Sequence, residues 1–257
     1  MRDTFERREI KYILNEAQEK RLQEKMKKYM VPDEYGESTI NSIYIDTPDY
    51  LMVRRSIEKP IFKEKLRIRS YGDGKGDETV YLEIKRKLNK TVYKRRVSMT
   101  YEEAMEFIES GKMPKFTDLR KSDNNIFPRA DMKNMEAKSK KKQILDELMY
   151  MQSFYGKLKL AAMISYDRKA DYGKDDNSFR ITVDRNIRMR DRDFRFESSD
   201  DGILLLPKDK MILEIKTKEG LPGWMLEYLN EEKLYKSSFS KYGEGYKKII
   251  LPNMKNL

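Results

Sequence analysis

Residues 63–71 read KEKLRIRSY and alternate charged with apolar side chains. In an extended strand, residues two positions apart share a face, so Lys65, Arg67 and Arg69 project to one side of this segment. The guanidinium groups of the two arginines can each grip phosphate oxygens in bidentate geometry. The pair alone fits an exposed basic strand edge equally well, since such edges discourage aggregation. The rest of the chain has to decide between these interpretations.

The same alternation returns on five other segments. Their charged or polar positions are Arg7, Glu9 and Lys11; Glu83, Lys85 and Lys87; Tyr166 and Arg168; Arg180, Thr182 and Asp184; and Glu214 and Lys216. The apolar positions between them are Ile10, Leu66, Ile68, Leu82, Ile84, Ile181, Val183, Leu213 and Ile215. Six such strands predict a sheet closed around a charged lumen, with its apolar face turned outward beneath covering helices.

The charges assigned to this lumen are mostly positive. With Lys63 and Lys241 included, the inward set has twelve basic and four acidic side chains, an excess of about eight positive charges. Like charges confined in this way repel one another strongly unless an anion is present. A polyphosphate group is therefore the guest that the pattern predicts.

Composition narrows the chemistry further. The chain has 257 residues and a net charge of +11, which favours acidic partners. It contains no Cys and no His, so thiolate nucleophiles, imidazole bases and zinc-thiolate sites are excluded. Any metal must be hard and bound by oxygen, so Mg²⁺ and Mn²⁺ are the candidates. We find no long apolar run and no signal-peptide pattern, and we expect a cytoplasmic protein with a single domain over residues 1–257.

Turn and capping signals give the expected order of elements. We predict strands over residues 6–14, 40–46, 63–71, 79–87, 92–99, 162–170, 179–188 and 211–217. We predict helices over 16–30, 101–110 and 143–158, and one more around Trp224 that packs this residue instead of presenting it for base stacking. Residues 72–76 are expected to be a flexible hairpin loop, and the polar, lysine-rich run 115–142 a mobile surface excursion.

Several other features invite a functional interpretation. Glu83 with Lys85 and Glu214 with Lys216 repeat a Glu-Ile-Lys unit, which cross-strand salt bridges would explain as well as a metal-bearing lumen would. Residues 238–245 place Lys241 among small residues that suit close backbone approach to an anion. They lack the spacing of a P-loop, and no GxGxxG follows a strand.

The ordered motifs resemble a known family. They are Arg7-x-Glu9-x-Lys11, IYIDTPDY at 43–50, LRIRSYG at 66–72, LEIK at 82–85, SYDR at 165–168, RITVD at 180–184, LEIK at 213–216 and SKYG at 240–243. Together they resemble the catalytic domain of the vacuolar transporter chaperone (VTC) complex. This domain forms the polyphosphate polymerase branch of the triphosphate tunnel metalloenzymes, also called the CYTH superfamily. The resemblance covers essentially the whole chain.

The resemblance implies an α+β fold, with an eight-stranded antiparallel tunnel and helices packed on its outside. It also implies transfer of the γ-phosphoryl group of ATP to a growing polyphosphate chain, with Mn²⁺ or Mg²⁺ as cofactor. Carried over by motif, the residues that would grip phosphates are Lys11, Arg67, Arg69, Lys85, Arg168 and Lys241, with Tyr166 and Ser240 as hydrogen-bonding neighbours. Glu214 would ligate the metal, and Glu9 and Glu83 are its competitors for that role. We place Glu9, Lys65, Glu83 and Lys216 in the substrate-binding set, and also Lys94 and Arg96, whose strand face the sequence leaves ambiguous.

One departure from the motifs bears on the reaction. Tunnel hydrolases typically begin with Glu-x-Glu-x-Lys, whereas Arg7 stands here in place of the first Glu, which favours the polymerase branch. The alternatives are a triphosphatase of the same tunnel class, in which water is the acceptor, and a non-catalytic module that binds tripolyphosphate or polyphosphate. Nucleic acid is a disfavoured partner, because the basic residues alternate into a lumen instead of interleaving with exposed aromatics.

Overall fold

One large antiparallel sheet organises the protein. The computed structural model describes residues 8–71, 79–89, 91–111, 130–196 and 200–254 and, within 130–140, the backbone alone. The strands are β1 Arg8–Asn15, β2 Met30–Asp46, β3 Phe62–Tyr71, β4 Val80–Leu88, β5 Thr91–Met99, β6 Lys159–Gly173, β7 Arg180–Arg190, β8 Ile203–Leu204 and β9 Lys210–Thr217. Eight of them follow the order β1-β9-β7-β6-β2-β3-β4-β5, and the short β8 pairs with β7. All these pairings are antiparallel.

The sheet curls, but its hydrogen-bonded ladder remains open within the described part of the chain. β1 and β5 are the two ends of the strand order and do not pair. Lys85 Nζ on β4 nevertheless lies 3.1 Å from Glu9 Oε2 on β1, so side chains connect the two halves of the inner face. The predicted α+β class with an eight-stranded antiparallel sheet is confirmed. Closure of that sheet into a barrel, which was also predicted, is not.

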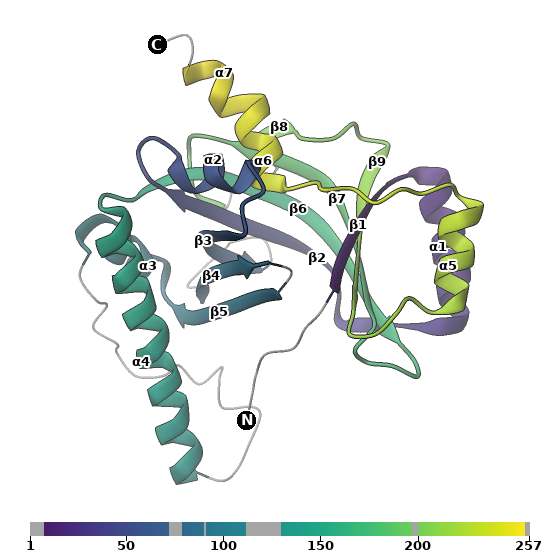
Figure 1. The fold of residues 1–257 in the computed structure, drawn as a ribbon, viewed down its shortest axis with the longest axis horizontal. Coiled ribbons are helices and arrows are strands. Elements are labelled where there is room, and N and C mark those ends of the chain that lie inside the picture. The colour runs from purple at the N-terminus through teal and green to yellow at the C-terminus, as the bar shows by residue number, and fades with distance from the viewer. Residues whose placement is uncertain (1–7, 72–78, 90, 112–129, 197–199, 255–257) are drawn as a thin grey trace.

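The helices form three groups around the sheet (Figure 1). They are α1 Glu16–Tyr29, α2 Leu51–Ile57, α3 Tyr101–Ser110, α4 Ala130–Tyr155, α5 Gly223–Glu231, α6 Lys241–Gly245, the π-helical turn η3 Tyr246–Ile250 and α7 Leu251–Met254. Local signals fix several of their ends. Asn15 and Gln18 form a capping box at the start of α1, Thr100 and Glu103 form another at α3, and Gly111 ends α3 with a φ of 70°.

Two of these groups bury the outer face of the sheet. Helices α1 and α5 cover β1, β7 and β9, where Leu22 and Tyr228 pack with Leu213. Helices α3 and α4 cover β3, β4 and β5, where Phe107 and Leu148 join the second cluster. All nine apolar positions predicted to face outward belong to these two clusters or pack against them. Burial of each such side chain contributes about 1.5–3 kcal/mol, which fixes the opposite face as the charged one.

The third group of helices departs from the prediction that helices pack on the outside. Helices α2 and α6 and the turn η3 pack against inner-face side chains at one end of the sheet, among them Tyr44, Tyr166 and Ile212. Tyr44 stacks on Tyr242 of α6 with ring centroids 4.6 Å apart. The segment 240–250 therefore closes over part of the inner face and brings its own polar side chains to that face.

Several predicted boundaries need correction. β2 is much longer than the predicted strand 40–46, because it continues from Met30 along β6. α4 begins at Ala130, so it overlaps the excursion predicted for 115–142, while 112–129 and the predicted loop 72–76 lie outside the described residues. α2 and β8 were not predicted. Trp224 stacks on Tyr29 at 5.0 Å, as expected for a packing residue. No helix among the described residues is both long and apolar enough to cross a membrane.

Candidate active site

A buried carboxylate organises the β3-β4-β5 side of the inner face. Glu83 is 1% exposed and accepts from Arg67 Nε at 2.9 Å, while Lys94 Nζ lies 2.6 Å from its other oxygen. Burial alone would raise the pKa of Glu83, but the charges of Arg67, Arg69 and Lys94 outweigh it and lower the pKa to about 2. Glu83 is therefore an anion that holds cations in place.

Strand register resolves the face of the two ambiguous residues. Glu83 lies opposite Arg96, and Lys85 lies opposite Lys94, so both β5 residues share the inner face. The intervening Arg95 points outward to Glu147 of α4, with Nε 3.0 Å from the carboxylate. Arg96 stands over the ring of Tyr81 at 4.6 Å, toward the open end of the sheet. The candidate site thus extends onto β5.

The two arginines of β3 are oriented by hydroxyl groups from β2 and β6. Arg67 Nη1 donates to the Tyr44 hydroxyl at 3.2 Å, and Arg69 Nη2 donates to the Tyr166 hydroxyl at 3.1 Å. Arg69 also donates to Ser42 Oγ at 3.3 Å. The guanidinium groups are thus held side by side in a fixed orientation, which suits bidentate recognition of phosphate.

The Tyr44 hydroxyl has a strongly lowered pKa. Burial opposes its ionisation, but the positive charges of Arg67, Lys65 and Arg69, with the hydrogen bond from Arg67, lower its pKa to about 7. For Lys65, burial has the larger effect: it lowers the pKa to about 8, even though the negative charge of Tyr44 favours the charged lysine. Burial lowers the pKa of Lys94 to about 8 as well, although Glu83 favours the charged lysine. The inner face therefore carries three groups, Tyr44, Lys65 and Lys94, with pKa values near neutral pH in a protein without histidine.

A second cluster joins β1, β4 and β9. Lys11 Nζ lies 3.5 Å from both Glu9 Oε1 and Glu214 Oε2, and Lys216 Nζ lies 3.0 Å from Glu214 Oε1. Burial would raise the pKa of Glu214, but Lys216 and Lys11 hold it well below its usual range. Lys85 lowers the pKa of Glu9 against the same effect of burial. Both carboxylates are ionised and lie around one ammonium group.

A third cluster forms where α6 meets the sheet. Arg168 binds Asp184 through two hydrogen bonds of 2.6 and 2.8 Å, and Lys241 Nζ lies 2.5 Å from the same carboxylate. Lys65 Nζ donates to Ser240 Oγ at 2.8 Å. Ser240 is the N-cap of α6, so this short helix begins at the cations of β3.

The structure brings the predicted site residues to one face of the sheet. The cations of this face are Lys11, Lys65, Arg67, Arg69, Lys85, Lys94, Arg96, Arg168, Lys216 and Lys241. Among them lie Glu9, Glu83, Glu214, Tyr166 and Ser240. Arg7 lies outside the described residues. Their chemical roles remain predictions. Sequence reasoning missed Tyr44, Ser42 and the central place of Asp184. Ser42 and Tyr44 do alternate with Ile43 and Ile45 in the predicted strand 40–46, as the arginines alternate with apolar residues in 63–71.

The carboxylates of the inner face suit a divalent cation that keeps several water ligands better than one enclosed by protein ligands alone. Among the described residues there is no group of three acidic, His or Cys side chains that could enclose a metal. Glu9 and Glu214 converge on a single cation, Lys11, and so could share another. Mg²⁺ is commonly held by one or two carboxylates, with waters and substrate phosphates as its other ligands. Lysines also lie on the oxygens of Glu9 and Glu214, but Glu83 is the poorer candidate because Arg67 binds it through two nitrogens.

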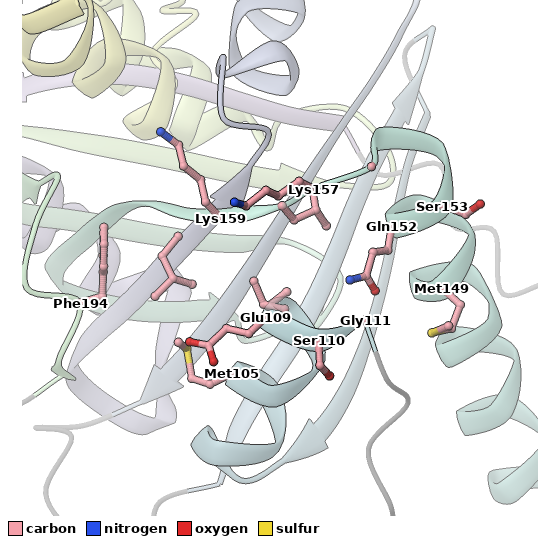
Figure 2. Close-up of a pocket in the computed structure, with 14 residues that line it drawn as sticks. Met105, Glu109, Ser110, Gly111, Met149, Gln152, Ser153, Lys157, Lys159 and Phe194 are labelled. Carbon is pink, nitrogen blue, oxygen red and sulfur yellow. The ribbon is translucent and has the colours of Figure 1, made fainter.

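A separate concavity lies away from this face. It has a volume of about 840 Å³ and is lined by residues of α3, α4, the start of β6 and Phe194 (Figure 2). Met105 and Met149 form part of its wall, and none of the predicted site residues lines it. The candidate chemistry therefore belongs to the inner face of the sheet.

A curled antiparallel sheet with arginines and lysines on its inner face is the arrangement that the family resemblance implies. The chain belongs to the VTC domain family, whose family model matches residues 6–250. This match confirms the family resemblance predicted from the motifs. A search of curated proteins finds no significant match.

The chain also matches solved structures at low sequence identity. An adenylate cyclase candidate from Bacillus halodurans is 14% identical, with a TM-score of 0.49 over 90% of this chain and 92% of its own. A Hippeastrum protein, described as an adenylyl cyclase candidate with a dominant triphosphatase activity, is 13% identical, with a TM-score of 0.48 over 92% of this chain and 93% of its own. A Pyrococcus horikoshii protein is 15% identical, with a TM-score of 0.42 over 96% of this chain and 99% of its own.

Proposed function

We propose that the protein is a metal-dependent polyphosphate polymerase that transfers the γ-phosphoryl group of ATP to a growing inorganic polyphosphate chain. The observation that carries the proposal is the excess of cations over carboxylates on one inner face. Phosphoryl transfer depends on positioning and on neutralisation of charge more than on a strong base. Membership of the VTC domain family supports the same assignment.

The chain's own residues would act as a fixed array of donors. Arg67 and Arg69 are pre-oriented by Tyr44 and Tyr166, so each presents its remaining N–H groups without reorganisation. Lys11, Lys85 and Lys241 add positive charges from three other directions. Such an array stabilises charge that develops on the equatorial oxygens of the transferred group. Its carboxylates are displaced from some of these cations when phosphate binds.

The state of the carboxylates favours a phosphate acceptor over water. Glu83 and Asp184 have pKa values lowered to about 2, and those of Glu9 and Glu214 are also lowered by neighbouring lysines. Carboxylates of such low basicity are poor acceptors for a proton from water. A terminal phosphate oxygen is already anionic at neutral pH and needs no base. Hydrolysis by the same site is the second candidate.

Glu214 and Glu9 are the residues that would hold the divalent cation, because they converge on Lys11 and their ion-pair partners among the described residues are lysines. When bound, Mn²⁺ or Mg²⁺ would neutralise phosphate charge and orient the triphosphate. Both carboxylates are ionised at neutral pH, as a hard cation requires.

Incubation of the pure protein with ATP labelled in the γ-phosphoryl group and Mn²⁺ tests the proposal. We expect labelled long-chain phosphate on a gel, stoichiometric with ADP. Arg95→Lys, on the outer face of β5, should retain this activity, whereas Arg69→Ala should lose it. Release of labelled orthophosphate without chains would assign the triphosphatase, and binding of ATP without turnover would assign a non-catalytic module.

A further inference from the structure

Thr182 is a buried polar residue that the proposed phosphate array does not use. It is 1% exposed, and its hydroxyl has no hydrogen-bond partner among the described residues. Its neighbours Ile181 and Val183 belong to the outer cluster beneath α1 and α5, so Thr182 faces inward. A buried hydroxyl without a partner lowers stability, so its presence calls for an explanation.

The position of Thr182 points to the carboxylate cluster. In the β7-β9 register Thr182 lies directly opposite Glu214, and in the β6-β7 register it lies opposite Ala170, which has no polar side chain. Directly opposed residues in an antiparallel pair have Cβ atoms about 4.5–5.5 Å apart. The hydroxyl is thus beside the carboxylate that converges with Glu9 on Lys11, yet it is not hydrogen-bonded there.

We propose that the Thr182 hydroxyl oxygen ligates the divalent cation together with Glu214. The inference rests on the metal dependence in the proposed function, but not on the identity of the phosphate acceptor. Hard cations take neutral oxygen donors besides carboxylates, and Ser or Thr hydroxyls serve Mg²⁺ in this way in P-loops. A third oxygen at this position would also reduce the number of waters that the cation must retain.

Binding of Mn²⁺ in the presence of tripolyphosphate, measured from the electron paramagnetic resonance signal of free Mn²⁺, tests the proposal. Thr182→Val removes the hydroxyl at nearly constant volume, whereas Thr182→Ser keeps it. We expect Thr182→Val to weaken Mn²⁺ binding by about tenfold or more and Thr182→Ser to bind nearly as the wild type does. Equal Mn²⁺ affinity of Thr182→Val and wild type would overturn the proposal, and so would a Thr182→Ser variant as weak as the valine variant.

Two measurements without metal show whether Thr182 is a metal ligand or a residue needed for packing. Without metal, Thr182→Val should melt at the wild-type temperature or above it, because it removes an unpartnered buried hydroxyl. Its affinity for tripolyphosphate in EDTA should be unchanged. A lower melting temperature with parallel losses of both affinities, or weaker tripolyphosphate binding in EDTA alone, would contradict metal ligation. A protein that binds Mn²⁺ through Thr182 but makes no polyphosphate would overturn the proposed function and leave this assignment standing.

Discussion

Arg67 is the residue in which several inner-face interactions meet. It reaches Glu83 through Nε and Nη2 and Tyr44 through Nη1, so a single planar fork connects β2, β3 and β4. A lysine at this position would keep the charge, but its single ammonium group cannot span both partners. We expect Arg67→Lys to fold and to lose turnover by roughly 10²-fold, because one pre-oriented donor set is lost. Steady-state rates with ATP measure this loss.

Arg95→Lys is the matched control for that substitution. Arg95 lies on the neighbouring β5 but points outward to Glu147, so the same chemical change there should leave turnover near that of wild type. Melting temperatures of both variants show whether either change acts through stability. Equal rates for Arg67→Lys and Arg95→Lys would remove Arg67 from the site.

Glu214 is the carboxylate that we assign to the metal. Glu214→Gln should abolish metal-dependent turnover and leave metal-free tripolyphosphate binding intact or tighter, because it removes a ligand and also a negative charge facing the phosphates. Titration of Mn²⁺ against activity in Glu214→Gln, Glu9→Gln and Glu83→Gln checks the assignment. If Glu214→Gln keeps the wild-type metal dependence while another variant loses it, the metal belongs to that other carboxylate.

Tyr44 gives the site a pH dependence that can be observed directly. Because folding lowers its pKa from 10 to about 7, ionisation stabilises the folded state only above the folded value, and this contribution grows as pH rises. Wild type should therefore gain stability relative to Tyr44→Phe as pH rises from about 7 toward 10. Lys65, with a pKa of about 8, loses its own charge within this range, which limits the gain at its upper end.

Absorbance of the phenolate measures the Tyr44 titration independently. We expect one tyrosine to ionise near neutral pH, to disappear in Tyr44→Phe and to shift to higher pH with tripolyphosphate, because bound phosphate neutralises the surrounding cations. A wild type without such a tyrosine would show that Tyr44 remains protonated. The shift depends on Lys65, Arg67 and Arg69, more than twenty residues away in the chain, so no local sequence pattern could have revealed it.

At the scale of elements, α6 carries the closing segment to the inner face. Its Tyr242 hydroxyl donates to Asp46, which also accepts from the backbone N–H groups of Met52 and Val53 at the start of α2. The fully buried Asp46 thereby ties β2, α2 and α6 together. This junction holds Lys241 and Ser240 in place. A change in packing outside the charged cluster should therefore displace these two residues of the cluster.

Gly245 tests that dependence. A Cβ at this position would lie 1.9 Å from Met189 Sδ on β7, so Gly245→Ala should displace the helix and cost about 1–3 kcal/mol. Gly223→Ala is the control, because a Cβ there meets nothing within 4 Å. Thermal melting measures the cost, and the double change Gly245→Ala with Met189→Ala should recover part of it. A Gly245→Ala variant that is as stable as Gly223→Ala would show that the contact relaxes freely.

The elements also show what local sequence can predict. Capping signals at Asn15 and Gly111 placed the start of α1 and the end of α3 to the residue, because these signals act within one turn of helix. The start of α4 at Ala130 and the extra length of β2 were missed. Strand length in β2 is set by its partner β6, which lies more than a hundred residues away. Alternation revealed which face is charged, but it could not show that α6 covers part of that face.

At the scale of the whole molecule, one curled sheet separates an apolar exterior from a cationic interior. The apolar clusters beneath α1, α5, α3 and α4 favour the curled form, whereas the cations on the inner face repel one another in it. Glu9, Glu83, Asp184 and Glu214 offset part of this repulsion. Whether β1 and β5 pair could not be deduced from alternation, which reports the face of a residue and not the neighbour of its strand.

A polyanion should therefore stabilise the entire fold. Tripolyphosphate relieves repulsion that exists only when the inner face is assembled, so it should bind the folded state. At one hundred times its dissociation constant it should raise the free energy of unfolding by about 2.7 kcal/mol, and the melting temperature should rise accordingly. Added salt should reduce the effect, because screening weakens attraction to clustered charges. Arg69→Ala should respond less than Arg95→Lys, since only Arg69 faces inward. A melting curve that millimolar tripolyphosphate leaves unmoved would contradict an inner face built to hold phosphate, because cations this close together would then be compensated by their own carboxylates alone.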